Sequence, residues 1–425
     1  MDYASALEYL DSLKGEGIKP RLEHTKFILG RLGFRQDFRV IHVAGSKGKG
    51  SVSAFANSIL CEAGFKTGFY LSPPLQGFVE RISVNRRFVS EREVVRLVED
   101  VKPFVEELSF SSLGKPTFFE VVTAMALRYF QIKGVEFAVL EVGMGGCLDS
   151  TNVVDSAVSV VTNIELEHTR YLGSMIAQIT REKAGIIKPN TTCVTESEDS
   201  EVLGILEGIC AERNARLVKV GSDVRYGKIK SDSRGQSFGI SGGFNYRSLR
   251  IKLLGEHQVA NAVTAVTAVR AAINISEAKV RSGLIKTKWP GRLEVVSKKP
   301  TVLLDGAHTM RGVAALIDSL KLFEYDKLYL VLGISKDKPM TDITRKLAPL
   351  ATEVIATKAA VENAGDPRVI LGEAVKHTES AVIEDVGEAV RYVRRRARPR
   401  DLILITGSLY VVGEARRAWH RKVVL

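Results

Sequence analysis

The stretch Val43-Ala44-Gly45-Ser46-Lys47-Gly48-Lys49-Gly50-Ser51 has the composition of a phosphate-binding loop. An apolar run at 40–44 that is typical of a β-strand leads into it, and apolar residues at helical spacing follow it. Glycines let consecutive backbone N–H groups turn toward phosphate oxygens, and a helix N-terminus adds partial positive charge. Lys49 would then reach the terminal phosphates and Ser51 would face Mg²⁺. The stretch predicts a nucleotide-binding strand, loop and helix.

The spacing departs from the strict P-loop pattern, because Gly50 separates Lys49 from Ser51. The alternative interpretation is a glycine-rich turn with a solvated lysine. The correct structural flanks on both sides favour the nucleotide site.

Length and composition indicate a globular enzyme. The 425 residues predict roughly two or three domains. The four cysteines are scattered, and none has the spacing of a structural zinc site. Because the sequence also lacks a recognisable signal peptide and a long apolar segment, we expect a cytoplasmic location and no membrane partner.

The net charge of +12 raises the alternative of a nucleic-acid-associated ATPase. The positive charge is spread along the chain without an aromatic-interleaved basic motif, and ATP and an acidic substrate are equally good partners for a basic enzyme. The dense arginine cluster at 391–400 is interpreted as the solvated end of a helix. We therefore expect no nucleic-acid partner.

Polar residues follow several apolar strands in the first half of the chain. Glu141 ends the buried run 137–142 and precedes a glycine-rich turn, as a carboxylate that binds Mg²⁺ beside a P-loop would. The alternative is a buried glutamate paired with an arginine. Ser72 and His168 also follow strand-like runs, at the carboxyl ends where α/β proteins bind ligands. A structural role for His168 remains an equal alternative.

The pattern of apolar and polar residues changes twice in the second half of the chain. Short alternating segments at 216–254 predict a small β-rich part, and a helix follows on which Gln258 and Asn261 share a face. That spacing suits contact with a base or ribose, and equally simple helix capping. After a break at 289–292, strands and helices alternate again, which predicts a doubly wound sheet. We place the domains at 1–295 and 296–425.

Taken together and in order, these segments resemble the folylpolyglutamate synthases and dihydrofolate synthases of the Mur ligase superfamily. The resemblance covers nearly the whole chain. The matching motifs are Gly45–Ser51, Ser72–Leu75, Glu80–Ile82, Glu141–Asn152, Glu167–Gly173, Arg181–Lys188, His257–Ala262, Trp289–Glu294, Asp305–Thr309 and Gly407–Glu414. The resemblance implies an α/β fold with a P-loop-containing, Mur-ligase-like ATP domain and a C-terminal, Rossmann-like glutamate-ligase domain.

The resemblance implies ATP-dependent amide formation. A folate-like or pteroate-like carboxylate would attack the γ-phosphate to give an acyl phosphate, and the amine of L-glutamate would displace phosphate. Lys49, Glu141, His168 and Lys183 would be the catalytic residues, and a monomer is expected. The implied ATP contacts are Gly45, Ser46, Lys47, Gly48, Lys49, Gly50, Ser51, Gln258, Asn261, Arg292 and Asp305. The implied ligands of Mg²⁺ are Ser72, Glu141 and His168. Lys183 matches a lysine that is carbamylated in the family. His308 and Ser408 match positions that the family associates with the incoming glutamate.

Some residues depart from the family pattern. Pro74 replaces the histidine of the family motif, and Cys147 replaces its usual arginine. Glu167 replaces an aspartate, Lys47 an asparagine, and Thr309-Met310 an Asn-Pro pair. The first two fall where the acceptor or its loop would lie. Our hypothesis is intact ligase chemistry with a modified pterin or another carboxylate as an alternative acceptor.

Overall fold

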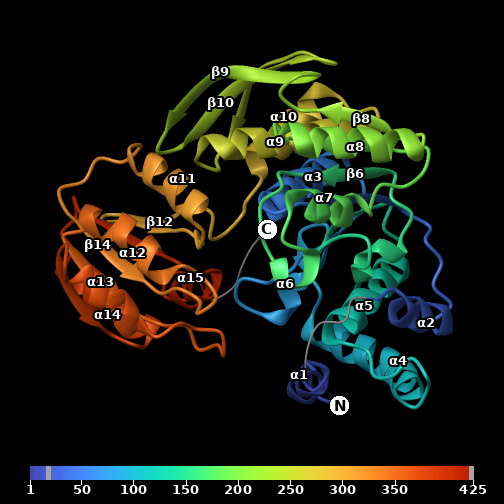
Figure 1. Ribbon diagram of the computed structural model, residues 1–425, viewed down its shortest axis with the longest axis horizontal. Helices are drawn as coiled ribbons and strands as arrows, with labels where there is room; N and C mark the ends of the chain where they lie inside the picture. Colours follow the sequence, from blue (N-terminus) through green and yellow to red (C-terminus); the bar gives the residue numbers. More distant parts are fainter. Residues whose placement is uncertain (16–20, 421–425) are drawn as a thin grey trace. The chain divides into compact units, whose positions relative to one another are not determined.

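The computed structural model describes residues 1–15 and 21–420, and the chain divides into two compact units (Figure 1). The first unit comprises Met1–Lys228, Phe238–Arg250 and Val259–Thr287. The second comprises Ile229–Ser237, Ile251–Gln258 and Lys288–Leu425. The domain limits at 295 and 296 stay a prediction.

The first unit is built on an eight-stranded sheet with the order β4-β3-β2-β5-β1-β6-β7-β8. Strands β2, β5, β1, β6, β7 and β8 run parallel, while β3 and β4 extend the sheet by antiparallel pairing. The strands are β1 (Arg39–Ala44), β2 (Thr67–Tyr70), β3 (Ile82–Val84), β4 (Arg87–Phe88), β5 (Phe137–Glu141), β6 (Val158–Val161), β7 (Thr192–Thr195) and β8 (Arg216–Lys219).

Helices α1 (Tyr3–Asp11), α2 (Glu23–Arg31), α4 (Glu91–Ser109) and α5 (Phe118–Lys133) are labelled in Figure 1. Their apolar residues share one buried cluster with residues of β1, β2 and β5. Capping boxes begin α4 at Ser90 and α5 at Thr117, because each hydroxyl accepts from the N–H three residues on and the glutamate there accepts in return. Further helices of the first unit are α3 (Lys49–Ala63), α6 (Thr169–Leu172), α7 (Ile176–Ala184), α8 (Ser200–Glu212) and α10 (Glu277–Lys286), with 3₁₀ turns at Phe78–Arg81 and Ser150–Val153. Helix α9 (Glu256–Ala272) begins in the second unit and belongs to the first from Val259 onward.

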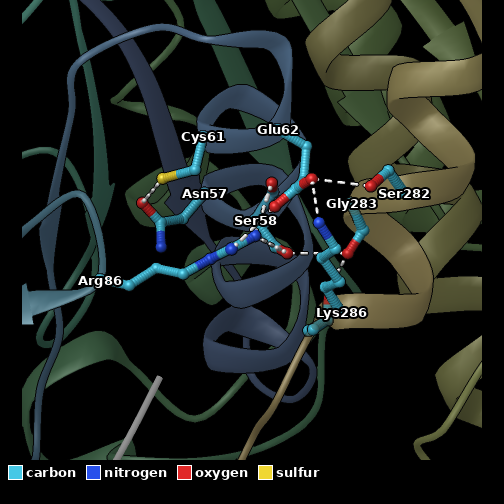
Figure 2. Close-up of polar contacts among 9 residues, drawn as sticks. Asn57, Ser58, Cys61, Glu62, Arg86, Ser282, Gly283 and Lys286 are labelled. Atoms are coloured by element: carbon cyan, nitrogen blue, oxygen red, sulfur yellow. Dashed lines mark hydrogen bonds and ion pairs between the residues drawn. The ribbon is translucent and has the colours of Figure 1, made fainter.

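Helix α10 packs closely against α3, the helix that follows the glycine loop. A side chain at Gly283 would collide with the backbone of Ile59, so the two helices approach as closely as a glycine allows. Beside this contact, the carboxylate of Glu62 accepts hydrogen bonds from Ser282 and Lys286 of α10, both at 2.7 Å, and from Arg86 at 2.8 Å (Figure 2). Steric fit and a satisfied carboxylate together hold α3 in place.

The β-rich stretch expected at 216–254 divides into two parts. Its first strand, β8, is the edge of the eight-stranded sheet, because it pairs in parallel with β7. The remainder, β9 (Val224–Asp232), β10 (Gly235–Gly242) and β11 (Tyr246–Ile251), forms a separate three-stranded sheet. The alternation of apolar and polar residues predicted strands here, but not which sheet each strand joins.

The second unit confirms the predicted α/β alternation. Its six-stranded sheet has the order β12-β13-β17-β14-β15-β16, in which only β12 runs antiparallel to its neighbour. The strands are β12 (Glu294–Lys298), β13 (Thr301–Leu304), β14 (Leu328–Leu332), β15 (Glu353–Ala356), β16 (Glu379–Val382) and β17 (Leu402–Thr406). The helices are α11 (Met310–Leu320), α12 (Met340–Leu347), α13 (Pro367–Ala374), α14 (Val386–Arg396) and α15 (Leu409–Arg416), with a 3₁₀ turn at Ala348–Leu350. Across residues 1–15 and 21–420, we find no helix with the length and apolarity needed to span a bilayer.

Candidate active site

The glycine loop connects β1 directly to α3, and two of its glycines are sterically required. Gly48 caps α3 in the left-handed region with φ +87°, and Gly45 has φ +139°, where a side chain would collide with that of Thr162. Lys49 is the first residue of α3. Since the first N–H groups of a helix have no intrahelical acceptor, this end of α3 is suited to bind an anion.

The first part of the loop is occupied by other contacts. The N–H of Ser46 donates to the carbonyl of Asn163 at 2.8 Å, and the N–H of Lys47 donates to the Asn163 side chain at 2.9 Å. The Ser46 hydroxyl also donates to the carbonyl of Glu165 at 3.2 Å. These contacts involve the first part of the loop, whereas Gly48 to Ser51 form the start of α3.

Three of the predicted site residues follow neighbouring strands at the same sheet edge. Glu141 ends β5 as the register partner of Val43 on β1, and only 7% of it is exposed. Ser72 follows β2, whose Tyr70 is the register partner of Leu140 on β5, and its hydroxyl accepts from Arg81 at 3.3 Å. His168 follows β6, is exposed, and begins α6 with φ +48°. The sheet thus places Glu141 on the strand beside β1, and Ser72 one strand further away at the same edge as the glycine loop.

Lys183 on α7 reaches the same loop from within the protein. Its side chain is 2% exposed, and its Nζ donates to the carbonyl of Gly45 at 3.0 Å and to Oε1 of Glu167 at 2.8 Å. Lys49 donates to the same Gly45 carbonyl at 2.9 Å. Burial, helped by the nearby Lys49 charge and opposed by Glu167, lowers the pKa of Lys183 to about 8.

Gln258 and Asn261, expected to act together, belong to different units. In the first unit, Oδ1 of Asn261 lies 2.5 Å from the position that a Cβ of Gly48 would take. In the second, Nε2 of Gln258 is 3.2 Å from Nε2 of His257. Burial, with a contribution from Arg292, lowers the pKa of His257 to about 4, so this histidine is neutral at physiological pH.

The other predicted residues of the second unit follow adjacent strands. Asp305 follows β13 and accepts from the N–H groups of Leu293 at 2.8 Å and Ala307 at 2.9 Å. Burial raises the pKa of Asp305, against the opposing effect of the Arg292 guanidinium. The Nδ1 atom of His308 lies 2.7 Å from the carbonyl of Gly306.

Ser408 follows β17, the parallel neighbour of β13, and caps α15 by accepting from the N–H of Tyr410 at 3.2 Å. Arg292, Asp305, His308 and Ser408 therefore gather near one edge of the six-stranded sheet.

Comparison with known proteins shows which domain families the two sheets belong to. Residues 43–269 match the Mur ligase middle domain, and residues 291–409 match the Mur ligase glutamate ligase domain. The dihydrofolate synthase/folylpolyglutamate synthase of Bacillus subtilis is 34% identical over 428 residues, covering 98% of each chain. The chain belongs to the folylpolyglutamate synthase and dihydrofolate synthase family of Mur ligases. It is therefore an ATP-dependent ligase, as the motifs predicted.

Two solved structures of this family agree in fold. The folylpolyglutamate synthase of Thermotoga maritima is 35% identical, with a TM-score of 0.88 over 98% of this chain and 96% of its own. The Mycobacterium tuberculosis folylpolyglutamate synthase, solved with ADP and AMPPCP, is 31% identical, with a TM-score of 0.91 over 99% of this chain and 100% of its own. The expected combination of a P-loop ligase domain and a C-terminal α/β domain is confirmed.

Within this ligase fold, the structure adds candidate residues that the sequence reasoning missed. The ring of Phe119 packs against Gly143, immediately after the Glu141 strand, and lies 6.0 Å from the ring of Tyr70. Asp149 is buried nearby, and burial raises its pKa although it accepts from Met144 N–H at 2.9 Å and Thr151 N–H at 3.0 Å. The position of Asp149 inside the motif 141–152 is the sequence feature that could have identified it as a candidate site residue.

Two of the divergent residues lie on loops at the same edge of the eight-stranded sheet. Cys147 is exposed in the loop after β5, with its N–H bonded to the carbonyl of Glu182 at 2.8 Å, and Pro74 is half-buried in the loop after β2. Both substitutions thus fall on loops that follow the strands carrying Ser72 and Glu141.

Proposed function

We propose that this ligase joins L-glutamate to the carboxylate of a folate-like pterin through an acyl phosphate, as a folylpolyglutamate synthase and dihydrofolate synthase. The supporting observation is the convergence of Lys49 and Lys183 on the carbonyl of Gly45, beside the N-terminus of α3 and the buried Glu141. The Lys49 ammonium and the helix N-terminus form a site for a phosphoryl group that is transferring to a carboxylate, and Lys183 reaches the same point of the loop.

Each part of this site matches one requirement of the reaction. A carboxylate resists attack by an amine because its oxide is a poor leaving group, and phosphorylation supplies phosphate in its place. The Lys49 ammonium neutralises negative charge on the phosphoryl group during transfer, since it sits on the first residue of α3. The amine of glutamate then attacks the acyl carbon, and the carbon–oxygen bond to phosphate breaks as the amide forms.

The donor chemistry at the loop fits Mg²⁺. Glu141 and Ser72 present oxygen ligands at adjacent strand ends, and His168 follows β6. Mg²⁺ usually keeps water and substrate oxygens among its ligands, so a few protein side chains suffice to hold it. Such an ion would offset phosphate charge in the transfer.

We also propose that Lys183 is carbamylated in the active enzyme. Carbamylation requires a neutral amine, and burial favours that form of Lys183. The carbamate would be a carboxylate beside the loop in place of an ammonium. Exchange of the Lys183 ammonium for an anion would also remove the ion pair with Glu167.

We propose that the acceptor substrate binds beside Phe119 and Asp149. An aromatic ring can stack on a pterin, and a buried carboxylate can accept hydrogen bonds from pterin amino groups. The changed residues Pro74 and Cys147 on the neighbouring loops keep a second candidate open, a Mur-type ligase for a modified pterin or another carboxylate.

For the remaining parts, we propose that His308 and Ser408 of the second unit bind the incoming glutamate, and that the enzyme is a monomer of the cytoplasm. The support is their placement on loops after adjacent strands, next to Asp305. Four free cysteines, two of them buried, suit a reducing compartment.

The test is phosphate release from ATP with Mg²⁺ and glutamate, comparing dihydropteroate, tetrahydrofolate and no acceptor, with mass spectrometry of the products. We expect one added glutamyl unit on at least one of the two pterins. If neither pterin stimulates phosphate release in protein that binds ADP, the pterin assignment is wrong and the second candidate replaces it.

A further inference from the structure

The turn that carries Arg292 has a backbone that depends on contacts from other segments. Gly291 has φ +74° and Leu293 has φ +45°, so the residues on both sides of Arg292 lie in the left-handed region. That region costs free energy for a residue with a side chain, as leucine is. The turn therefore needs hydrogen bonds from its surroundings to keep this conformation.

Three hydrogen bonds hold the turn. The carbonyl of Gly291 accepts from the N–H of Gly306 at 3.0 Å, and the N–H of Leu293 donates to Asp305 at 2.8 Å. The N–H of Gly291 donates to Oε2 of Glu294, the first residue of β12, at 3.0 Å. Two of the bonds thus come from the loop after β13, and the third depends on the orientation of the Glu294 carboxylate.

Arg416 fixes that carboxylate. Its Nε donates to Oε1 of Glu294 at 3.0 Å and to Oε2 at 2.9 Å. Arg416 is the last residue of α15 and its side chain is only 6% exposed, while that of Glu294 is 19% exposed. A carboxylate so far removed from water is stable only with such a partner. The ion pair therefore connects α15 to the turn that carries Arg292.

The turn in turn places the Arg292 guanidinium. Its Nη1 atom lies 2.7 Å from the position that a Cβ of Gly306 would take, so the guanidinium fills the space that this glycine leaves open. Its charge also reaches the carboxyl of Asp305, whose rise in pKa it opposes. A shift of the turn would move the guanidinium out of this place beside the loop after β13.

We propose that Arg416 is a positioning residue of the ligase, which acts through Glu294 to fix the turn and so the direction in which Arg292 meets the nucleotide. This rests on the proposed ligase function for the nucleotide and on the predicted contact between Arg292 and ATP. A guanidinium is planar and binds phosphate through directed hydrogen bonds, so its contribution depends on its orientation.

The experiment measures binding of AMPPCP, a non-hydrolysable ATP analogue, with Mg²⁺ by calorimetry to the full chain without acceptor or glutamate. We expect Arg292→Ala to weaken binding by about tenfold or more, because a charged hydrogen bond to phosphate is lost. Arg416→Met should weaken binding by about threefold to tenfold through misplacement of Arg292. The double variant should bind as Arg292→Ala does, because Arg416 acts only through Arg292.

Arg396→Met is the matched control. Arg396 is likewise the last residue of its helix, α14, and its Nε lies 2.9 Å from Oε2 of Glu353, the first residue of β15. Because β15 runs parallel to β14, Glu353 lies at the sheet edge opposite to the loops that follow the strands. Loss of this ion pair should lower the thermal stability and leave the AMPPCP affinity unchanged.

Arg416→Lys keeps a cation at the Glu294 carboxylate and should retain more affinity than Arg416→Met. Thermal unfolding verifies the folded state of each variant, and Arg416→Lys takes the place of Arg416→Met in the double variant if the methionine variant does not fold. A purely structural role of Arg416 would lower stability without this dependence on Arg292.

Four results would overturn the proposal. They are wild-type affinity in the folded Arg416 variant, additive losses in the double variant, an equal loss in Arg396→Met, and wild-type affinity in Arg292→Ala, which would leave Arg416 no contact to position. All are binding results, so they are independent of turnover. If the dependence on Arg292 is found and no pterin gains glutamate, the acceptor is wrong and the role of Arg416 stands. If pterins are glutamylated without that dependence, the ligase function stands.

Discussion

The Nζ atom of Lys183 lies 2.8 Å from Oε1 of Glu167 and 3.0 Å from the carbonyl oxygen of Gly45 in the glycine loop. Burial acts against the charge on each partner, while their mutual attraction favours it. The net result for Lys183 is a pKa lowered to about 8, so a substantial fraction of its amine is neutral near that pH. An amine that is both buried and partly neutral is chemically distinct from the exposed lysines of the chain.

Lys183→Arg separates a carbamate from an ion pair. Arginine keeps a positive charge that can bond to Glu167 and Gly45, but it does not form a carbamate. We expect kcat to fall by about a hundredfold or more while ADP binding is retained. Lys188→Arg is the control, because Lys188 is half-buried in the same motif and its amine bonds to the carbonyl of Asn152 at 3.1 Å. Near-normal turnover in Lys183→Arg would show that Lys183 acts through its positive charge.

Lys49→Ala should remove turnover without unfolding the protein. The Lys49 amine bonds to the carbonyl of Gly45 in its own loop at 2.9 Å, and removal of one such hydrogen bond costs little stability. The loss of a charge at the transferring phosphoryl group should reduce kcat by roughly a hundredfold to a thousandfold. Steady-state phosphate release and thermal unfolding on the same sample provide the two measurements. A folded and fully active variant would refute the assignment of the loop.

Gly283→Ala should destabilise the first unit by about 1–3 kcal/mol, because the added methyl group meets Ile59 with contacts of 2.8 Å to Cγ1 and 2.9 Å to the backbone nitrogen. Gly208→Ala on α8 is the matched control. That glycine has open space around its Cβ position, so alanine there should stabilise by about 0.5–1 kcal/mol through helix propensity. Urea unfolding of both variants checks the difference, and an equal effect of the two would contradict the close packing of α3 and α10.

His42 should make the protein sensitive to mild acid. Burial, with a small contribution from Lys188, lowers the pKa of His42 to about 3, and its Nε2 lies 2.8 Å from the hydroxyl of Thr151. The unfolded chain takes up this proton near the ordinary value of 6.5 and the folded protein does not, so the stabilising contribution is complete above 6.5 and falls as the pH drops toward 3. His42→Asn should flatten the pH dependence of the unfolding free energy between these values. An unchanged slope would show that His42 is protonated in the folded state.

Glu62 should add a second acid-sensitive step at lower pH. Burial tends to raise its pKa, but hydrogen bonds from Lys286, Ser282 and Arg86 outweigh this and lower it to about 2 (Figure 2). A carboxylate with a lowered pKa stabilises the fold above its ordinary value of 4.5 and loses that contribution as the pH falls toward 2. Glu62→Gln should therefore destabilise at pH 7 and have little effect near pH 2. Equal destabilisation at both pH values would assign the effect to packing alone.

Much of this enzyme was readable from local sequence. Apolar strands alternating with helices predicted both α/β sheets, and the glycine loop before α3 was found because left-handed backbone at Gly48 and close approach at Gly45 both require glycine. Glu141, Ser72 and Ser408 were found because parallel strands in one sheet end at one edge, so a polar residue after an apolar run marks that edge. These features depend on a few consecutive residues and are present in any window that contains them.

Other features arise from contacts between distant segments, and no local pattern encodes them. Asn163 takes two N–H donors of the glycine loop, although more than a hundred residues separate them. The bond from Arg416 to Glu294 joins residues that are 122 positions apart, and β8 joins the main sheet through its register with β7. The lowered pKa of Lys183 has the same origin, because burial and neighbouring charges are properties of the folded chain rather than of the residue.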